Sequence, residues 1–318
     1  MHTVAVGADI ANAHFDAARL DAGGRYEHKR FSNDLAGSVA FLAWPAGFGG
    51  ERPLARMEAA GAYSPPLAGF LFARGGPVAV ANPARIAAFA KTELSRAKTD
   101  KADAKLVARF AREKQPPLWK PLPPALRALQ SLLRRAEDLR GMLQTERNRL
   151  DAAEAARPIE AVTKALGAEM ESVKARLRKR TDEDPDLRGR RDLLESIPGT
   201  GGAAAARLLA ALHPHRGLAS AKRAAAHAGL DVRIRDPGKR IGTRHLAKRG
   251  DPPLRKAPYM PALAAWRHNP AVKALCERLK AKGKNGKPVA CAAMRKLLHL
   301  AFAILKSGKP FDPNYGLA

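Results

Sequence analysis

A proline-rich stretch at residues 116–124 divides the chain into two parts with different sequence patterns. Five of these nine residues are prolines, and a helix cannot continue through them because proline lacks the backbone N–H group and clashes with the preceding turn. Before this stretch, short apolar runs alternate with segments of helical spacing; after it, helical spacing dominates. We therefore predict an α/β domain at residues 1–114, followed by mainly helical segments.

The first domain is expected to open with three strands. Mostly apolar or alternating runs predict strands at residues 3–10, 15–20 and 26–31, and a turn signal at residues 21–24 separates the last two. Further strands at 54–58 and 77–81 alternate with helices at 34–44, 65–74 and 84–90. This order of elements predicts a mixed sheet.

The segment after the prolines has apolar residues spaced alternately three and four apart. The pattern covers about three heptads between Leu129 and Leu150, so we predict a long amphipathic helix that pairs with another chain or folds back. A second helix is expected at 161–180, and residues 182–185 (DEDP) end it. Residues 115–185 are thus predicted to form a proline-rich hinge and a helical coiled-coil linker, and residues 186–318 a mainly α-helical domain.

Pro258 and Pro261 interrupt one segment of helical spacing in this last domain. A proline inside a helix costs about 3 kcal/mol. We expect the helix there to be kinked, to start later, or to be damaged.

The charge balance limits the partners of the chain. Lys and Arg number 57 against 30 Asp and Glu, a net charge of +27, which favours nucleic acid first and an anionic membrane surface second. No apolar run approaches the roughly 20 residues of a spanning helix, and no signal peptide is recognisable. Cys276 and Cys291 lack metal-ligand spacing and are expected to be reduced thiols. Composition therefore predicts a cytosolic protein that binds nucleic acid.

Four acidic residues of the first domain are expected to converge. Asp9 and Glu58 each end a predicted strand, and a charge in so apolar a strand needs a partner or a function. Thr99 is suited to cap a helix in whose first turn Asp100 and Asp103 share a side. Acids in a first turn also suit the helix dipole, so solvated side chains are the alternative interpretation. Converging carboxylates repel one another unless divalent cations such as Mg²⁺ neutralise them, and a pair of such ions clamps a phosphodiester.

Two features of the last domain are predicted to bind nucleic acid. Gly199 and Gly201 form a tight hairpin before an alanine-rich helix, and exposed N–H groups there could hold a phosphate, although a plain connection between helices is equally compatible. A glycine-punctuated basic loop follows at 233–256, and its few aromatic residues favour phosphate contacts over base stacking. A solvated basic face is the alternative. The predicted contacts in this loop are Lys239, Arg240, Arg244, Lys248, Arg249 and Arg255.

Motifs along nearly the whole chain resemble one known family. The family is the "IS one-ten" group of insertion-sequence transposases, which are guided by a bridge RNA. The matching segments are residues 6–11 (VGADIA), 57–61 (MEAAG), 81–85 (ANPAR), 98–104 (KTDKADA), 196–201 (SIPGTG), 226–230 (AHAGL), 248–251 (KRGD) and 267–270 (RHNP).

The resemblance implies a fold, a site and partners. It implies an RNase H-like, RuvC-like first domain whose metal-binding and catalytic acids map onto Asp9, Glu58, Asp100 and Asp103, with two Mg²⁺ ions. It also implies a last domain with a nucleophilic serine, but Pro237 stands in that position and has no hydroxyl. The implied partners are double-stranded DNA at element ends and target, a structured guide RNA, and further copies in a dimer or a dimer of dimers. The implied location is the bacterial cytoplasm, associated with the nucleoid.

Three functions remain open from the sequence. The first is a transposase that cuts and rejoins DNA at insertion-sequence ends, impaired in serine-dependent strand transfer by Pro237. The second is a metal-dependent endonuclease that resolves DNA junctions with water as the nucleophile. The third is a catalytically inactive relic that only binds nucleic acid.

Overall fold

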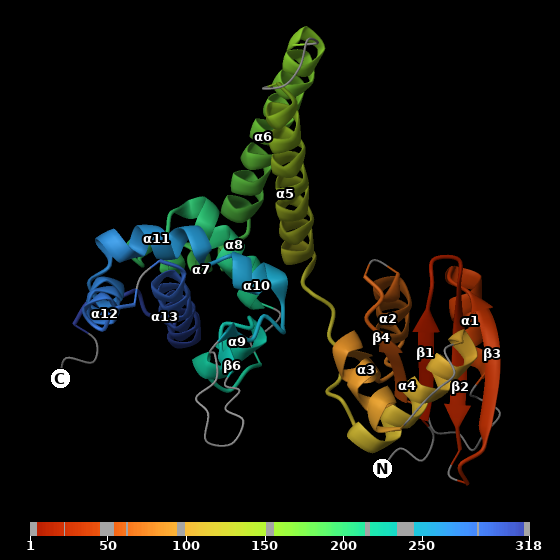
Figure 1. The fold of residues 1–318 in the computed structure, drawn as a ribbon. Helices are drawn as coiled ribbons and strands as arrows, with labels where there is room; N and C mark the ends of the chain where they lie inside the picture. The colour runs from red at the N-terminus through yellow and green to blue at the C-terminus, as the bar shows by residue number, and fades with distance from the viewer. Residues whose placement is uncertain are drawn as a thin grey trace. The chain divides into compact units, whose positions relative to one another are not determined.

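The computed structural model describes residues 5–21, 23–44, 54–61, 63–93, 99–150, 156–213, 217–233, 245–284 and 286–314 (Figure 1). The chain forms two compact units, Met1–Pro121 and Leu122–Ala318. In the described residues, the first unit contains a mixed sheet with helices, and the second is helical apart from a two-stranded ribbon.

The first unit is built on a five-stranded sheet with the strand order β3-β2-β1-β4-β5. Strand β2 runs antiparallel to both β1 and β3, whereas β4 is parallel to β1 and β5 is parallel to β4. The predicted mixed sheet is therefore confirmed. The strands are β1 (Ala5–Ile10), β2 (His14–Leu20), β3 (Tyr26–Ser32), β4 (Leu54–Glu58) and β5 (Val78–Ala81).

Helices cover both faces of this sheet. Helices α1 (Leu35–Ala43) and α2 (Ser64–Ala73) close one face, where Phe41 and Leu67 pack in the same cluster as Val6. Helices α3 (Pro83–Thr92) and α4 (Asp100–Lys114) close the other face. There α4 packs on β2, and α3 joins α4 through Phe89 and Phe110, whose rings lie 5.5 Å apart.

Helix α4 lies directly on β1. A Cβ atom added to Gly7 would lie 2.1 Å from the backbone nitrogen of Ala108, so only glycine permits this approach. Thr99 caps α4, as the sequence predicts, and its Oγ1 accepts a hydrogen bond of 3.2 Å from the backbone N–H of Ala102. The start of α4 is therefore fixed relative to the strands.

The second unit begins with a long helical hairpin. Helices α5 (Pro124–Leu150) and α6 (Ala156–Glu183) lie side by side in Figure 1. Ala136 and Leu139 of α5 form a buried cluster with Met170 and Val173 of α6. The apolar stripe of α5 is thus covered at least in part by the same chain, while a coiled coil with another chain stays a prediction.

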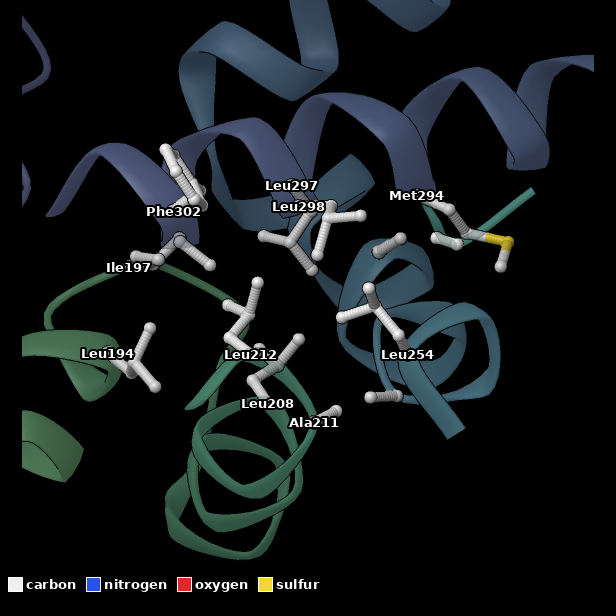
Figure 2. Close-up of a cluster of buried hydrophobic side chains, with 14 of the residues drawn as sticks. Leu194, Ile197, Leu208, Ala211, Leu212, Leu254, Met294, Leu297, Leu298 and Phe302 are labelled. Carbon is white, nitrogen blue, oxygen red and sulfur yellow. The ribbon is translucent and has the colours of Figure 1, made fainter. Parts of the chain in front are cut away.

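The remaining helices enclose one apolar core. Figure 2 shows Leu194, Ile197, Leu208, Leu254 and Leu298 among the side chains that meet there. They come from α7, the turn after it, α8, α10 and α13. The elements are α7 (Pro185–Glu195), α8 (Gly202–Leu212), α9 (Ala221–His227), β6 (Val232–Arg233), β7 (His245–Leu246), α10 (Pro252–Lys256), α11 (Tyr259–His268), α12 (Pro270–Ala281) and α13 (Lys287–Ser307).

The two prolines expected to disturb a helix mark a boundary between two helices. Helix α10 ends at Lys256, and Pro258 is the N-cap of α11. Pro261 lies in the first turn of α11, where a backbone N–H would have no partner within the helix in any case. Because both prolines stand where an N–H is dispensable, neither breaks the fold.

Helix α13 is long and apolar enough, by length and composition alone, to cross a membrane. The apolar runs of the sequence had predicted no segment of that kind. The core helix of a soluble protein passes the same test, and Leu297, Leu298 and Phe302 of α13 lie in the core of the second unit.

Candidate functional site

Asp9 and Glu58 lie beside each other on the α4 side of the sheet. Ala8 pairs with Met57 in the parallel register, so the next residues along β1 and β4 are neighbours. Gly7 faces α4, and side chains alternate between the faces of a strand, so Asp9 faces α4 as well. Asp100 and Asp103 occupy the first turn of α4. The structure thus gathers the four predicted acids around one end of α4.

Charge interactions link these acids. Burial raises the pKa of Asp9, and the charges of Asp103 and Asp100 raise it further. Burial raises the pKa of Glu58 too, with added contributions from Asp9 and Asp103. The carboxylates therefore resist ionisation together, and a bound divalent cation would reverse that effect.

A fifth acid, Asp16, lies directly opposite Asp9 in the antiparallel register of β1 and β2. It is only 1% exposed, and its carboxylate contacts His28 Nε2 at 2.6 Å and Arg30 Nη2 at 2.9 Å. Its charge also raises the pKa of Asp9. Asp16 was not among the predicted site residues, although it carries the same signal as Asp9, a charge within an apolar strand.

His14, Asp16 and Asp100 form a closer group than the predicted acids do. Their potential ligand atoms lie within 4.8 Å of one another, and the four predicted acids do not form such a group among the residues that the structure describes. His14 Nε2 lies 3.7 Å from Asp100 and 3.9 Å from Asp16, and it has no hydrogen-bond partner among the residues that the structure describes. Arg30 contacts both carboxylates, Asp100 at 3.2 Å. The Arg30 guanidinium thus already balances negative charge on the two carboxylates of this group.

Arg56 is the buried cation nearest to Glu58 along β4. It pairs with Gly7 in the register and therefore shares the α4 side of the sheet. The residue is 4% exposed, its Nε has no hydrogen-bond partner in the described part of the chain, and burial lowers the pKa of Arg56 to about 10. No carboxylate contributes to that shift. Among the described residues, the guanidinium is thus largely withdrawn from water without a carboxylate to offset the cost.

In the second unit, Gly199 and Gly201 have different surroundings. Gly199 has a φ of 95°, and an added Cβ would lie 2.4 Å from the backbone nitrogen of Ala265 in α11. Its lack of a side chain is therefore explained by helix packing. Gly201 is the N-cap of α8, is exposed and has open space around it. Phosphate binding at this hairpin stays a prediction.

The basic loop is described only at its ends. Pro237, Lys239, Arg240 and Arg244 lie outside the described residues. Lys248 and Arg249 are exposed. Arg255 instead donates hydrogen bonds of 3.1 Å to the carbonyl oxygens of Ala228 and Lys248, so its side chain holds the turn after β7 in place.

Comparison with known proteins assigns the chain to a family. Residues 6–153 match a family model described as Transposase, and residues 191–277 match one described as Transposase IS116/IS110/IS902 family. Two relatives named pilin gene-inverting protein, from Moraxella bovis and Moraxella lacunata, are each 30% identical over 315 residues, covering 96% of this chain and 97% of theirs. An insertion element IS110 uncharacterized 43.6 kDa protein of Streptomyces coelicolor is 28% identical over 120 residues, 38% of this chain and 30% of that protein. With both family models matched in order and relatives aligned from end to end, this chain belongs to the IS110 family of transposases.

Proposed function

We propose that this protein cuts and rejoins DNA at the ends of an insertion element, using divalent cations held by an RNase H-like first domain. The family is one of transposases, which act on DNA and in this group carry an acidic, DEDD-type domain suited to divalent metals. The observation that carries the proposal is the electrostatic cluster of Asp9, Glu58, Asp100 and Asp103. Three meandering strands followed by two parallel ones support the RNase H-like assignment.

The donor set fits a hard cation. All four predicted ligands offer carboxylate oxygens, which Mg²⁺ prefers, and two of the four, Asp9 and Glu58, have pKa values raised by burial and by neighbouring acids. When bound, such ions stabilise the attacking and leaving oxygens of a phosphodiester during in-line displacement. Two Mg²⁺ ions are part of the proposal.

The chain's own residues would bind the cations and hold the carboxylates in position. Asp9 and Glu58 come from strands whose spacing is fixed by backbone pairing, so they would form the rigid side of the site. Arg30, anchored on the buried Asp16, contacts Asp100. This anchored arginine would hold the Asp100 carboxylate near β2 and β3 until a cation competes for it.

The rejoining step depends on a nucleophile that this chain lacks at the family's position. Pro237 cannot form a covalent bond to a phosphate, because it has no hydroxyl. We therefore expect no covalent protein–DNA adduct from the unaltered chain and expect adducts from Pro237→Ser. Adducts formed equally by both proteins would contradict this part of the proposal.

A second candidate is a junction-resolving nuclease that uses water as the nucleophile. Pro237 favours it, because the four acids alone suffice for metal-dependent hydrolysis. The relatives named pilin gene-inverting protein favour recombination instead, since their name describes the inversion of a pilin gene. A catalytically inactive nucleic-acid binder is the remaining alternative.

Further parts of the proposal concern partners and location. A structured guide RNA, assembly into a dimer or a dimer of dimers, and action at the bacterial nucleoid in the cytoplasm follow from the resemblance. The net charge of +27 supports nucleic-acid partners.

A cleavage assay on junction DNA of the element, with Mg²⁺ and with or without RNA from its flanks, tests the proposal. We expect Mg²⁺-dependent cleavage that Asp9→Asn abolishes and that Glu169→Gln, a change at an exposed acid of α6, leaves intact. Joined products identify a recombinase, and nicked branched DNA without joining identifies the nuclease. Tight, salt-sensitive binding with no cleavage in any divalent metal would refute both and leave the binder.

A further inference from the structure

Helices α5 and α8 of the second unit border two adjoining cavities. One has a volume of about 440 Å³ and extends to α10; the other has about 670 Å³ and extends to α6 and α7. Leu133, Arg140 and Arg207 line both cavities. Together the cavities follow α8 from Gly202 to Ala211, and we call them the α5–α8 groove.

The groove is lined by more cations than its acids can balance. The acids have partners: Glu137 contacts Lys256 at 2.7 Å, and Asp182 and Glu195 both contact Arg191. The fourth acid, Asp251, caps α10 and accepts a hydrogen bond from the backbone N–H of Leu254. Four arginines that line the groove have no ion pair or hydrogen bond in the part of the chain that the structure describes; they are Arg134, Arg140, Arg178 and Arg207.

Arg207 stands out because nothing in the fold requires a cation there. It is the one charged residue of α8, and its neighbours in the helix are alanine and leucine. Burial lowers the pKa of Arg207, and the charge of Arg140 lowers it further, with only partial compensation by Glu137. Two arginines brought together beside a cavity cost free energy unless an anion lies between them.

We propose that the α5–α8 groove binds the phosphate backbone of the DNA substrate. The inference rests on the proposed function, which supplies DNA as the partner, and adds a site that the sequence analysis did not identify. Guanidinium groups bind phosphate oxygens in pairs of parallel hydrogen bonds. No aromatic side chain lines either cavity among the described residues, so the groove is suited to the backbone and not to stacked bases.

The size of the groove matches a short backbone segment. Helix α8 has 11 residues and is therefore about 16 Å long. A strand of B-form DNA carries one phosphate per roughly 3.4 Å of helix axis, so about five phosphates of one strand span this length, enough for each of the four unpaired arginines to contact one.

The test measures how DNA binding depends on salt. Arg140→Gln/Arg207→Gln in the full chain is compared with Arg135→Gln/Arg176→Gln, which removes the same charge from exposed positions of α5 and α6 outside the groove. Fluorescence anisotropy with a labelled duplex gives the slope of log K against log salt. Each lost phosphate contact lowers that slope by about 0.9, so the groove variant should lose about 1.8 and the control much less.

A second groove variant repeats the test without a change at Arg207. Arg140→Gln/Arg178→Gln changes exposed residues only, so it repeats the measurement even if the Arg207 variant does not fold. Equal slopes for groove and control variants would overturn the inference, as would a loss of slope seen with duplex RNA and not with DNA. A protein that shows the groove-dependent slope but never cleaves DNA would refute the proposed function and leave the groove site standing.

Discussion

Replacing Arg56 by methionine should stabilise the first unit, by at most about 3 kcal/mol. Burial lowers the pKa of Arg56 to about 10, roughly two and a half units below its ordinary value, and each unit corresponds to about 1.4 kcal/mol. The guanidinium is 4% exposed, and its Nε lacks a hydrogen-bond partner, so little screening by water reduces this cost. Methionine keeps the unbranched shape and removes the charge.

The pH dependence of the gain follows from the direction of the shift. A base whose pKa is lowered by folding destabilises the fold wherever the group stays protonated, that is, below about pH 10. The advantage of Arg56→Met over the wild type should therefore be constant near neutral pH and shrink as the pH rises through that value.

Urea unfolding of the full chain, with hydrogen exchange of the β1 and β4 amides to localise the effect, measures the free energy. Arg19→Met is the matched control, because Arg19 is also 4% exposed but its Nη2 contacts Glu27 at 2.6 Å. Losing that pair should destabilise the unit by about 1–3 kcal/mol. If Arg56→Met destabilised the protein as Arg19→Met does, Arg56 would have a stabilising partner and the reasoning would fail.

Four other changes test separate features. Gly7→Ala should destabilise the first unit by about 1–3 kcal/mol or more in urea unfolding, because the new methyl group would meet the α4 backbone. Leu139→Ala should cost about 2–5 kcal/mol and expose the α5–α6 hairpin, where this side chain is fully buried, to limited proteolysis. Asp9→Asn should raise the melting temperature of metal-free protein near neutral pH, and the gain should vanish as acid protonates Asp9, whose pKa is raised in the fold. Arg30→Ala should lower the urea midpoint of the first unit by leaving the buried Asp16 carboxylate with one partner fewer, whereas Arg25→Ala, at an exposed pair, should leave the midpoint almost unchanged.

The sequence predicted most elements of the first unit because their signals are local. Strand β4 begins and ends as expected, at Leu54 and Glu58, and Thr99 caps α4 through its own side chain. Pro258 was harder to interpret, since a proline within helical spacing can kink a helix or separate two helices. The structure shows the second case, because α10 and α11 pack as separate elements.

A residue of the candidate site could be predicted from the sequence only where its place in a single strand or helix indicated its position. Asp9 lies one residue before the end of β1 and Glu58 ends β4, so their positions follow from strand geometry. The group of His14, Asp16 and Arg30 depends on pairing between β1, β2 and β3, and no spacing along the chain reports it. The α5–α8 groove likewise joins arginines from different helices, which only tertiary packing brings together.

The contact between Gly7 and α4 affects how the acids of this site keep their spacing while the sequence around them changes in evolution. The strand that carries Asp9 and the helix that carries Asp100 and Asp103 meet backbone to backbone at this point, so the spacing of their acids does not depend on the size of intervening side chains. Lineages can therefore exchange most of the surrounding core residues and keep the same carboxylate arrangement, provided that one position in β1 never gains a side chain.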